Sequence, residues 1–354
     1  MGSSKIIGFG IIGLGMIAEF HTRAIAELAG CRFVAGFDAV SGRADSFCAA
    51  HGGTPYSSLE AFLADPGIDI VTVATPSGLH LDSAVAAIRA GKHIVVEKPL
   101  EITLERCDTI ITEAAAHKVK LGTVFPSRYF ESSRAVKKAI DEGRLGKIVL
   151  ADAHIKWYRS QEYYDSGKWR GTWKFDGGGA LMNQGVHAVD LLRWFMGDVT
   201  EVFSRTATLA HERIEVEDTA AAVLQFANGA MGTIEATTCA WPGFLKKIEI
   251  CGSKGSIVME EENITTWQFA EERPGDEEIR RRYRKNPDVP KGGGASDPLA
   301  IDYRNHRCLF EAFVDAVRNN KPFEIDGREG RKSVEIIEGI YRSAKDNRPV
   351  ALPL

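Results

Sequence analysis

Short apolar runs alternate with helical patterns over the first 125 residues, and this alternation limits the possible folds more than any other feature of the sequence. Strands are expected at Ile6–Ile12, Arg32–Phe37, Ile70–Ala74, His93–Glu97 and Lys120–Phe125, and helices at Met16–Leu28, Arg43–His51, Ser83–Ala90 and Leu104–His117. Strands joined through helices of this length form right-handed βαβ units and a parallel sheet. We therefore predict a doubly wound α/β domain over residues 1–125.

The pattern changes after Gly143-Arg144-Leu145-Gly146. A helix is expected at Gly179–Phe195, and strands at Ile148–Trp157, Val202–Leu209, Thr219–Phe226, Ala230–Thr238, Lys246–Cys251 and Ser256–Glu260. Strands in succession form a large, mostly antiparallel sheet, so residues 126–354 are expected to be an α+β domain. Residues 271–298 are rich in charged residues, Pro and Gly, so a surface loop is expected there. A lid over the substrate is the alternative. Two final helices, Tyr303–Asn319 and Arg328–Asp346, can pack back on the first domain.

The bulk composition excludes several classes of function. The chain has 354 residues and a formal net charge of −4, which offers no basic surface for nucleic acid or an anionic membrane. No apolar run approaches the roughly 18–20 residues of a membrane helix, and the amino terminus lacks the apolar core of a secretory signal, so a cytoplasmic location is expected. The six cysteines show neither a Cys-x-x-Cys pair nor a Cys/His cluster, so we expect reduced thiols and no metal site.

The first predicted strand turns into the first predicted helix through Gly13-x-Gly15-x-x-Ala18. Gly13 permits a tight turn, Gly15 lets the backbone approach a pyrophosphate, and the helix N-terminus faces the phosphates. Asp38 ends the next strand, where a carboxylate binds a ribose diol and repels a 2′-phosphate. The pattern predicts a Rossmann-type dinucleotide site that prefers NAD over NADP. Arg43, which could face a phosphate, supports the NADP alternative.

Two further strand ends carry polar residues. In Val96-Glu97-Lys98-Pro99 the proline stops the strand, so the lysine is presented at the carboxyl edge of the sheet, where ligands bind. The turn Ala74-Thr75-Pro76-Ser77-Gly78-Leu79-His80 opens a helix and is a candidate lining for the nicotinamide ribose. Helix capping by Ser77 explains the same turn equally well.

A second group of candidate residues follows the triple glycine Gly177-Gly178-Gly179. Asn183 and His187 stand four apart on one face of the expected helix, and Asp190 lies one turn further, where it could steer the imidazole. The glycines would let the backbone approach a ligand or another strand closely. Upstream, Trp169-Arg170-Gly171-Thr172-Trp173 suits stacking on a flat ring or gripping an anion, although a packed loop explains it equally well.

Along nearly its whole length the chain resembles the glucose–fructose oxidoreductase / inositol dehydrogenase / MocA family. The resemblance rests on Gly13-Leu14-Gly15, Val96-Glu97-Lys98-Pro99, Gly185-Val186-His187 with Asp190, and the ending Tyr341-Arg342-Ser343-Ala344 through Leu352-Pro353-Leu354. The residues matching Lys98 and His187 are the family's catalytic pair beside the nicotinamide. Many members carry an aspartate where this chain has Asn183, which can orient a partner but cannot act as a base. That departure, with Trp-Arg-Gly-Thr-Trp and Asn-Gln-Gly-x-His, resembles the branch of UDP-N-acetylglucosaminuronate 3-dehydrogenases.

The resemblance implies an NAD-dependent dehydrogenase of a sugar or nucleotide-sugar alcohol, acting as a homodimer or homotetramer. His187 is expected to be the general base, Lys98 to hold the alkoxide-like oxygen and Asn183 to orient, although the first two roles could be exchanged. The expected cofactor contacts are Gly13, Gly15, Met16, Ile17, Asp38, Thr75, Pro76, Ser77, His80, Glu97, Lys98, Trp169 and Arg170. The expected substrate contacts are Arg128, Tyr158, Arg159 and His306.

Two other functions are compatible with this resemblance. Some relatives are glycosidases that use bound NAD as a transient oxidant before elimination, and net NAD reduction separates them from a dehydrogenase. Yeast galactose-pathway repressors use the fold as a dinucleotide-responsive binding module. The presence of both Lys98 and His187 argues against a regulator, since a sensor needs no proton-transfer pair.

Overall fold

The computed structural model describes residues 5–284 and 303–354, which form two units. The first unit is Met1–Pro126 with Asp302–Arg331, and the second is Ser127–Ile301 with Lys332–Leu354. The first boundary lies next to the expected one at residue 125. Residues 302–331 join the first unit, where helix α11 (Arg304–Arg318) packs on helix α1 (Met16–Ala26), the packing that the sequence allowed for the C-terminal helices.

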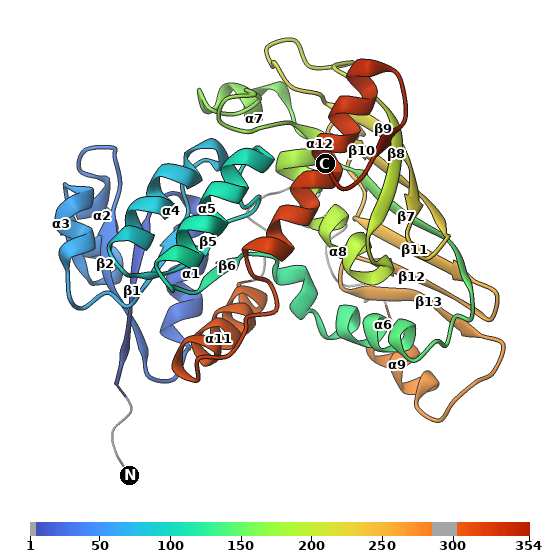
Figure 1. Ribbon diagram of the computed structural model, residues 1–354, viewed down its shortest axis with the longest axis horizontal. Coiled ribbons are helices and arrows are strands. Elements are labelled where there is room, and N and C mark those ends of the chain that lie inside the picture. Colours follow the sequence, from blue (N-terminus) through green and yellow to red (C-terminus); the bar gives the residue numbers. More distant parts are fainter. Residues whose placement is uncertain (1–4, 285–302) are drawn as a thin grey trace. The chain divides into compact units, whose positions relative to one another are not determined.

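The first unit contains a parallel six-stranded sheet in the order β3-β2-β1-β4-β5-β6, which confirms the predicted doubly wound fold (Figure 1). Its strands are β1 (Ile7–Ile12), β2 (Cys31–Phe37), β3 (Thr54–Tyr56), β4 (Ile70–Val73), β5 (His93–Val96) and β6 (Leu121–Thr123). Strands β1, β4 and the end of β5 are buried, so their continuous apolar runs form the core of this unit.

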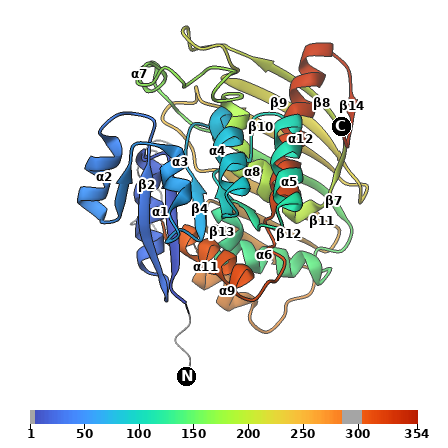
Figure 2. The same ribbon diagram turned by 60° about the vertical axis from the view of Figure 1, so that its left-hand side comes forward.

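Helices cover both faces of this sheet. Helices α4 (His80–Arg89) and α5 (Leu104–Ala116) lie side by side, as Figure 2 shows. Helix α2 (Arg43–His51) packs against β2 and β3. Helix α4 begins three residues earlier than expected, directly after a 3₁₀ turn at Ser77–Leu79.

Strand β3 and helix α3 (Leu59–Ala64) were not predicted from the sequence. Strand β3 has only three residues, one of them Pro55, and pairs on one side with β2. Such a short edge strand leaves almost no periodicity in the sequence, and proline is tolerated there because its missing N–H faces away from the ladder.

The second unit contains an eight-stranded sheet in the order β13-β12-β11-β7-β10-β9-β8-β14. Among its described strands only β7 and β10 pair in parallel, so the expected mostly antiparallel sheet is confirmed. Its strands are β7 (Ile148–Lys156), β8 (Val199–Ala207), β9 (Thr219–Phe226), β10 (Met231–Thr237), β11 (Lys247–Gly252), β12 (Gly255–Glu260), β13 (Asn263–Phe269) and β14 (Val350–Ala351). Strands β13 and β14 were not predicted.

One face of this sheet packs on helix α8 (Val186–Met196), which follows a π-helical segment at Ala180–Gly185. Side chains on the other face are exposed, with Phe203, Val223 and Met231 at 40%, 52% and 55%. The remaining described helices are α6 (Glu131–Asp141), α7 (Gln161–Asp165), α9 (Asp276–Arg282) and α12 (Gly327–Asp346), with a 3₁₀ turn at Pro126–Tyr129. The boundary between the units falls within α12.

The expected loop at residues 271–298 is only partly a loop. Helix α9 occupies part of it, and Arg280 on this helix pairs with Glu272 and Glu277. Residues 285–302, which include the rest of the expected loop and of its lid alternative, lie outside the described residues. Within the described ranges, no helix has the length and apolar character needed to cross a membrane.

Candidate functional site

The carboxyl ends of four strands in the first unit carry the predicted nucleotide-site residues. Gly13 follows β1, Asp38 follows β2, Thr75 lies beyond β4 and Lys98 lies beyond β5. The strand register aligns these ends through three pairs: Ile12 with Phe37, Ile12 with Val73, and Val73 with Val96. The loops selected from the sequence therefore share one edge of the sheet, where ligands of open α/β sheets bind.

The two glycines of the motif are needed for different reasons. Gly13 has φ +88°, and a Cβ there would lie 2.7 Å from the backbone nitrogen of Thr75. Gly15 has φ −86°, and a Cβ there would meet no atom within 4 Å. Gly13 is therefore required by the fold itself. Gly15 leaves open space beside the first turn of α1, which is what the approach of a pyrophosphate needs.

Asp38 connects the end of β2 to the glycine turn. Its Oδ2 accepts a hydrogen bond from the N–H of Leu14 at 2.8 Å, and its Oδ1 accepts one from the N–H of Val40 at 2.7 Å. Arg43, the residue behind the NADP alternative, lies 3.3 Å from Oδ2 and is half exposed. The carboxylate therefore orders the turn and also neutralises the nearby guanidinium.

The structure tests one of the two interpretations offered for the turn at Thr75–His80. Neither the 3₁₀ turn nor α4 has a side-chain cap, so capping by Ser77 is wrong. His80 is 1% exposed, with Nδ1 2.9 Å from the carbonyl oxygen of Pro99 and Nε2 3.0 Å from that of Thr75. Burial lowers the pKa of His80. His80 thus joins two loops of the edge, and its expected contact with the cofactor stays a prediction.

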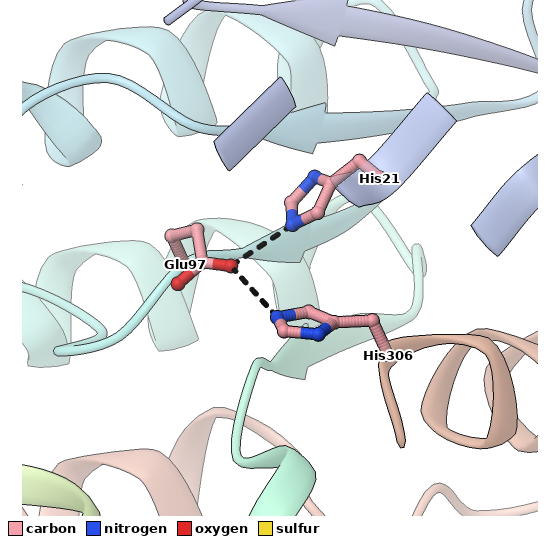
Figure 3. Close-up of side chains that lie close together, drawn as sticks. All are labelled: His21, Glu97 and His306. Atoms are coloured by element: carbon pink, nitrogen blue, oxygen red, sulfur yellow. Dashed lines mark hydrogen bonds and ion pairs between the residues drawn. The ribbon is translucent and has the colours of Figure 1, made fainter. Parts of the chain in front are cut away.

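Three buried side chains of the first unit converge at Glu97, the residue before Lys98 (Figure 3). His21 points from α1 and His306 from α11 toward the carboxylate of Glu97, which follows β5. Nε2 of His21 donates to Oε1 of Glu97 at 2.9 Å, and Nε2 of His306 lies 3.8 Å from the same oxygen. His306 is 3% exposed. Its ring faces a buried carboxylate, and its expected role as a substrate contact stays a prediction.

Glu97 also shapes the turn that presents Lys98. Its Oε2 accepts the backbone N–H of Lys98 at 3.0 Å, and its own backbone N–H donates to the carbonyl of Val73. Burial by itself would raise the pKa of Glu97, but the hydrogen bond from His21 and the charges of His21, His306 and Lys98 lower the pKa to about 2. The residue is a buried anchor for the lysine turn and is charged at neutral pH. It is 5% exposed, and its expected direct contact with the cofactor stays a prediction.

In the second unit the triple glycine packs against protein backbone and an aromatic side chain. A Cβ at Gly179 would lie 2.0 Å from the carbonyl oxygen of Glu217, and one at Gly178 would lie 2.0 Å from Oη of Tyr341. The Glu217 carboxyl group accepts the N–H groups of Gly179 and Leu181 and the hydroxyl of Tyr341. Burial raises the pKa of Glu217 to about 7, against the effect of these donors. Close packing within the protein therefore explains Gly178 and Gly179.

Asp176, which no sequence pattern had indicated, connects the tryptophan-rich loop to the candidate catalytic segment. Its Oδ2 accepts the N–H of Gly171 at 2.6 Å, and its Oδ1 accepts a hydrogen bond from Nδ2 of Asn183. Asp176 is 1% exposed. The amide at Asn183 is thus oriented by a buried carboxylate. Asn183 lies in the π-helical segment, a geometry often found at functional sites.

His187 is partly exposed on the first turn of α8, and Asp190, expected to steer its ring, has another strong partner. The carboxylate of Asp190 accepts two hydrogen bonds from Arg128, at 2.8 Å from Nε and 2.6 Å from Nη2. Arg128 is 2% exposed and lies 5.6 Å from the ring of Trp194. A fully buried bidentate pair holds α8 in place, and the expected substrate contact at Arg128 stays a prediction.

The other expected ligand contacts of this unit lie near one another. Nη2 of Arg159 donates to Oε1 of Gln184 at 2.9 Å, next to Asn183 in the chain. Arg170 stacks on Tyr163 and Trp169, each at 4.5 Å from the ring centroid. Tyr158 packs edge-on against Trp241, which is 75% exposed. Trp169, Arg170 and Tyr158 remain partly exposed and available to a ligand, whereas Arg159 is only 4% exposed.

Comparisons with known proteins agree with this architecture. Residues 7–125 match the model of an oxidoreductase family with an NAD-binding Rossmann fold, and residues 133–258 match the GFO/IDH/MocA C-terminal domain. Inositol 2-dehydrogenase of Rhizobium meliloti is 25% identical over 98% of this chain and 99% of that protein.

Two solved structures are similar over nearly the whole chain. The WlbA dehydrogenase from Bordetella pertussis, in complex with NADH and UDP-GlcNAcA, is 37% identical with a TM-score of 0.89, covering 99% of each chain. Levoglucosan dehydrogenase, in complex with NADH and levoglucosan, is 25% identical with a TM-score of 0.84, covering 98% of this chain and 100% of that one.

Proposed function

This chain belongs to the glucose–fructose oxidoreductase / inositol dehydrogenase / MocA family and is an NAD-binding oxidoreductase, and on that premise we propose that it oxidises the C3 hydroxyl of a UDP-linked sugar. One observation carries the substrate class. The similarity to the WlbA dehydrogenase extends over 99% of both chains, and that protein is seen with NADH and UDP-GlcNAcA. The motifs Trp169-Arg170-Gly171-Thr172-Trp173 and Asn183-Gln184-Gly185-Val186-His187 support the same branch.

The residues at the edge of the first sheet fit an NAD molecule. Gly15 leaves open space at the start of α1, whose first N–H groups would face the pyrophosphate, and Asp38 would accept hydrogen bonds from a ribose diol. When bound, NAD accepts a hydride from the carbon that bears the hydroxyl group. Thr75, Pro76 and Ser77 would line the nicotinamide ribose.

The proton chemistry is assigned to residues of this chain. His187 would take the hydroxyl proton as general base, since an imidazole titrates near neutrality. Lys98 would donate a hydrogen bond to the oxygen as it becomes negative. Asn183, whose amide is oriented by Asp176, would hold the sugar in place.

The proposal is tested by incubating the protein with NAD and either UDP-GlcNAcA, UDP-GlcNAc or free myo-inositol, and recording NADH absorbance. NADH formation with the UDP-uronate is expected, whereas turnover of myo-inositol alone would overturn the UDP-sugar assignment. Substrate consumption without net NADH would indicate the redox-elimination glycosidase instead. Lys98→Ala should still bind NAD while turnover falls at least ~10²-fold, and near-normal turnover would remove Lys98 from the chemistry.

We further propose a cytoplasmic homodimer or homotetramer that forms through the exposed face of the second sheet. All six cysteines are free thiols, which suits a reducing compartment. Phe203, Val223 and Met231 supply apolar area on neighbouring strands. In size-exclusion chromatography Val223→Glu should elute as a smaller species than the unmodified chain, and an unchanged elution volume would argue against this face.

A further inference from the structure

A histidine, an aspartate and a cysteine converge beside the second sheet, outside the proposed reaction site. His211 and Asp218 lie in the connection between β8 and β9, and Cys239 follows β10. Nδ1 of His211 is 3.1 Å from Oδ2 of Asp218 and 3.6 Å from Sγ of Cys239. One ligand atom from each residue lies within 4.8 Å of the other two.

The hydrogen bonds of His211 determine what can lie between these atoms. Nε2 of His211 is 2.9 Å from the carbonyl oxygen of Arg159, which can only accept, so Nε2 carries a hydrogen. A neutral imidazole then turns the lone pair of Nδ1 toward the carboxylate of Asp218. Two acceptors repel at this separation unless a positive centre joins them. A metal ion is such a centre; without one, Nδ1 can accept the thiol hydrogen of Cys239 at 3.6 Å.

A metal ion accounts for the thiol as well as for the carboxylate. Zinc binds nitrogen at about 2.0–2.1 Å, oxygen at about 2.0–2.2 Å and sulfur at about 2.3 Å. Tetrahedral geometry therefore implies a nitrogen–sulfur separation of ~3.5 Å and a nitrogen–oxygen separation of ~3.3 Å. The observed separations of 3.6 Å and 3.1 Å agree within a few tenths of an ångström. Donation of the other ring N–H to a backbone carbonyl is the usual support of a metal-bound histidine.

The surrounding backbone holds the carboxylate in place. The N–H groups of Leu209, Ala210 and His211 all donate to Asp218, whose side chain is fully buried, and the side chain of His211 is 6% exposed. Cys239 is partly exposed, which leaves a side of the cluster open to water as a fourth ligand.

We propose that Nδ1 of His211, Oδ2 of Asp218 and Sγ of Cys239 bind one zinc ion, with water as the fourth ligand. The ion would fasten the connection at residues 209–218 to the end of β10. Cys239 binds as thiolate, and its proton is released to solvent. Sequence spacing predicted no metal site, because the pairing of Thr219 in β9 with Thr237 in β10 is what brings Cys239 beside Asp218.

Cobalt(II) substitution tests the site without any assay of activity. The full chain is stripped with a chelator and titrated with Co²⁺, then with Zn²⁺. We expect one Co²⁺ per chain, a near-ultraviolet thiolate-to-cobalt charge-transfer band, and loss of this band when Zn²⁺ displaces the cobalt. Failure to bind either metal at micromolar concentration overturns the proposal.

Two variants assign the signal to this cluster. Cys239→Ala should abolish the charge-transfer band and weaken cobalt affinity at least ~10-fold, while Cys251→Ser, which changes another partly exposed thiol, should behave like the unmodified chain. Retained NAD binding and an unchanged circular dichroism spectrum would show that Cys239→Ala is folded. Undiminished binding in Cys239→Ala, without a thiolate band, would overturn the proposal and direct attention to the His21, Glu97 and His306 group.

Discussion

Glu97 and His21 form a buried hydrogen bond of 2.9 Å that connects the turn of the candidate catalytic lysine to α1, the helix that follows the glycine motif. The other oxygen of Glu97 accepts the backbone N–H of Lys98. The two parts of the nucleotide site that were identified separately in the sequence are therefore joined beneath the sheet edge. A fixed turn matters because catalysis needs the reacting groups held in a productive geometry.

Glu97→Gln should lower the stability of the first unit in a pH-dependent way. Because the pKa of Glu97 is lowered from 4.5 to about 2, its charged form contributes stability that is fully present above about pH 4.5 and is lost as the pH falls toward 2. The shift corresponds to roughly 3 kcal/mol at pH 7. The difference between the variant and the unmodified chain should therefore be large at pH 7 and shrink below pH 4.

The measurement must report on the first unit alone. All six tryptophans lie between residues 157 and 267, in the second unit, so we would follow urea unfolding by hydrogen exchange in peptides that cover β1 and β5. Glu113→Gln is the control, because its pair with the exposed Arg89 is screened by solvent and should contribute little to stability. Equal destabilisation by Glu97→Gln at pH 7 and pH 3 would show that the charge of Glu97 is not what stabilises the turn.

The two motif glycines should respond differently to alanine. Gly15→Ala meets no atom and keeps an ordinary φ, so its melting temperature should stay unchanged while NAD affinity falls at least ~10-fold through the lost approach of the pyrophosphate. Gly13→Ala should lower the melting temperature as well, because φ is +88° and the Cβ lies 2.7 Å from backbone. Calorimetric titration with NAD measures the affinity, and thermal unfolding measures the stability. Unchanged NAD affinity in Gly15→Ala would indicate that the pyrophosphate does not bind beside Gly15.

Asp38→Ser should shift cofactor preference toward NADP. The substitution removes the charge that repels a 2′-phosphate and releases Arg43 from its 3.3 Å ion pair. Leu14 N–H also loses its acceptor, but this loss affects both cofactors alike. The NADP-to-NAD ratio of kcat/KM should rise at least ~10-fold, or about 1.4 kcal/mol. Asp38→Ser with Arg43→Ala should remove most of the gain, and a gain that survives it would mean that Arg43 does not bind the phosphate.

The nucleotide-binding half could be predicted from sequence because its signals are local. Each βαβ unit places strand, turn and helix within some 30 residues, so Gly13, Asp38 and Lys98 fall at strand ends wherever the sheet forms. The register of β1, β4 and β5 then aligns them. The short β3 was not predicted because three residues show almost no alternation of apolar and polar side chains.

The partners of the candidate residues could not be predicted, because they come from distant parts of the chain. His306 joins Glu97 only after α11 returns to the first unit, and Asp190 pairs with Arg128 across 62 residues of sequence. The expected helical face of Asn183 and His187 assumed 3.6 residues per turn, but Asn183 lies in a π-helical segment. Buried polar side chains look the same in sequence whether they bind a ligand or one another.

Exchanging the residues at positions 176 and 183 tests whether Asp176 orients Asn183. In the unmodified chain the carboxylate of Asp176 accepts from the amide of Asn183 and from the N–H of Gly171. Asn183→Asp would place two carboxylates in contact, and one of them must then hold a proton. We expect a lower melting temperature above neutral pH and a kcat reduced at least ~10-fold with the UDP-uronate substrate.

Adding Asp176→Asn to Asn183→Asp should restore the hydrogen bond with donor and acceptor exchanged. The oxygen of the new amide can still accept from Gly171, while its NH₂ group donates to the new carboxylate on the π-helical segment. The double variant should therefore be more stable than Asn183→Asp, with a coupling energy of about 1–3 kcal/mol in a double-mutant cycle. A positioning role also predicts recovery of kcat at constant KM for NAD. If the double variant unfolds as readily as Asn183→Asp alone, the contact with Asp176 does not orient the side chain at position 183.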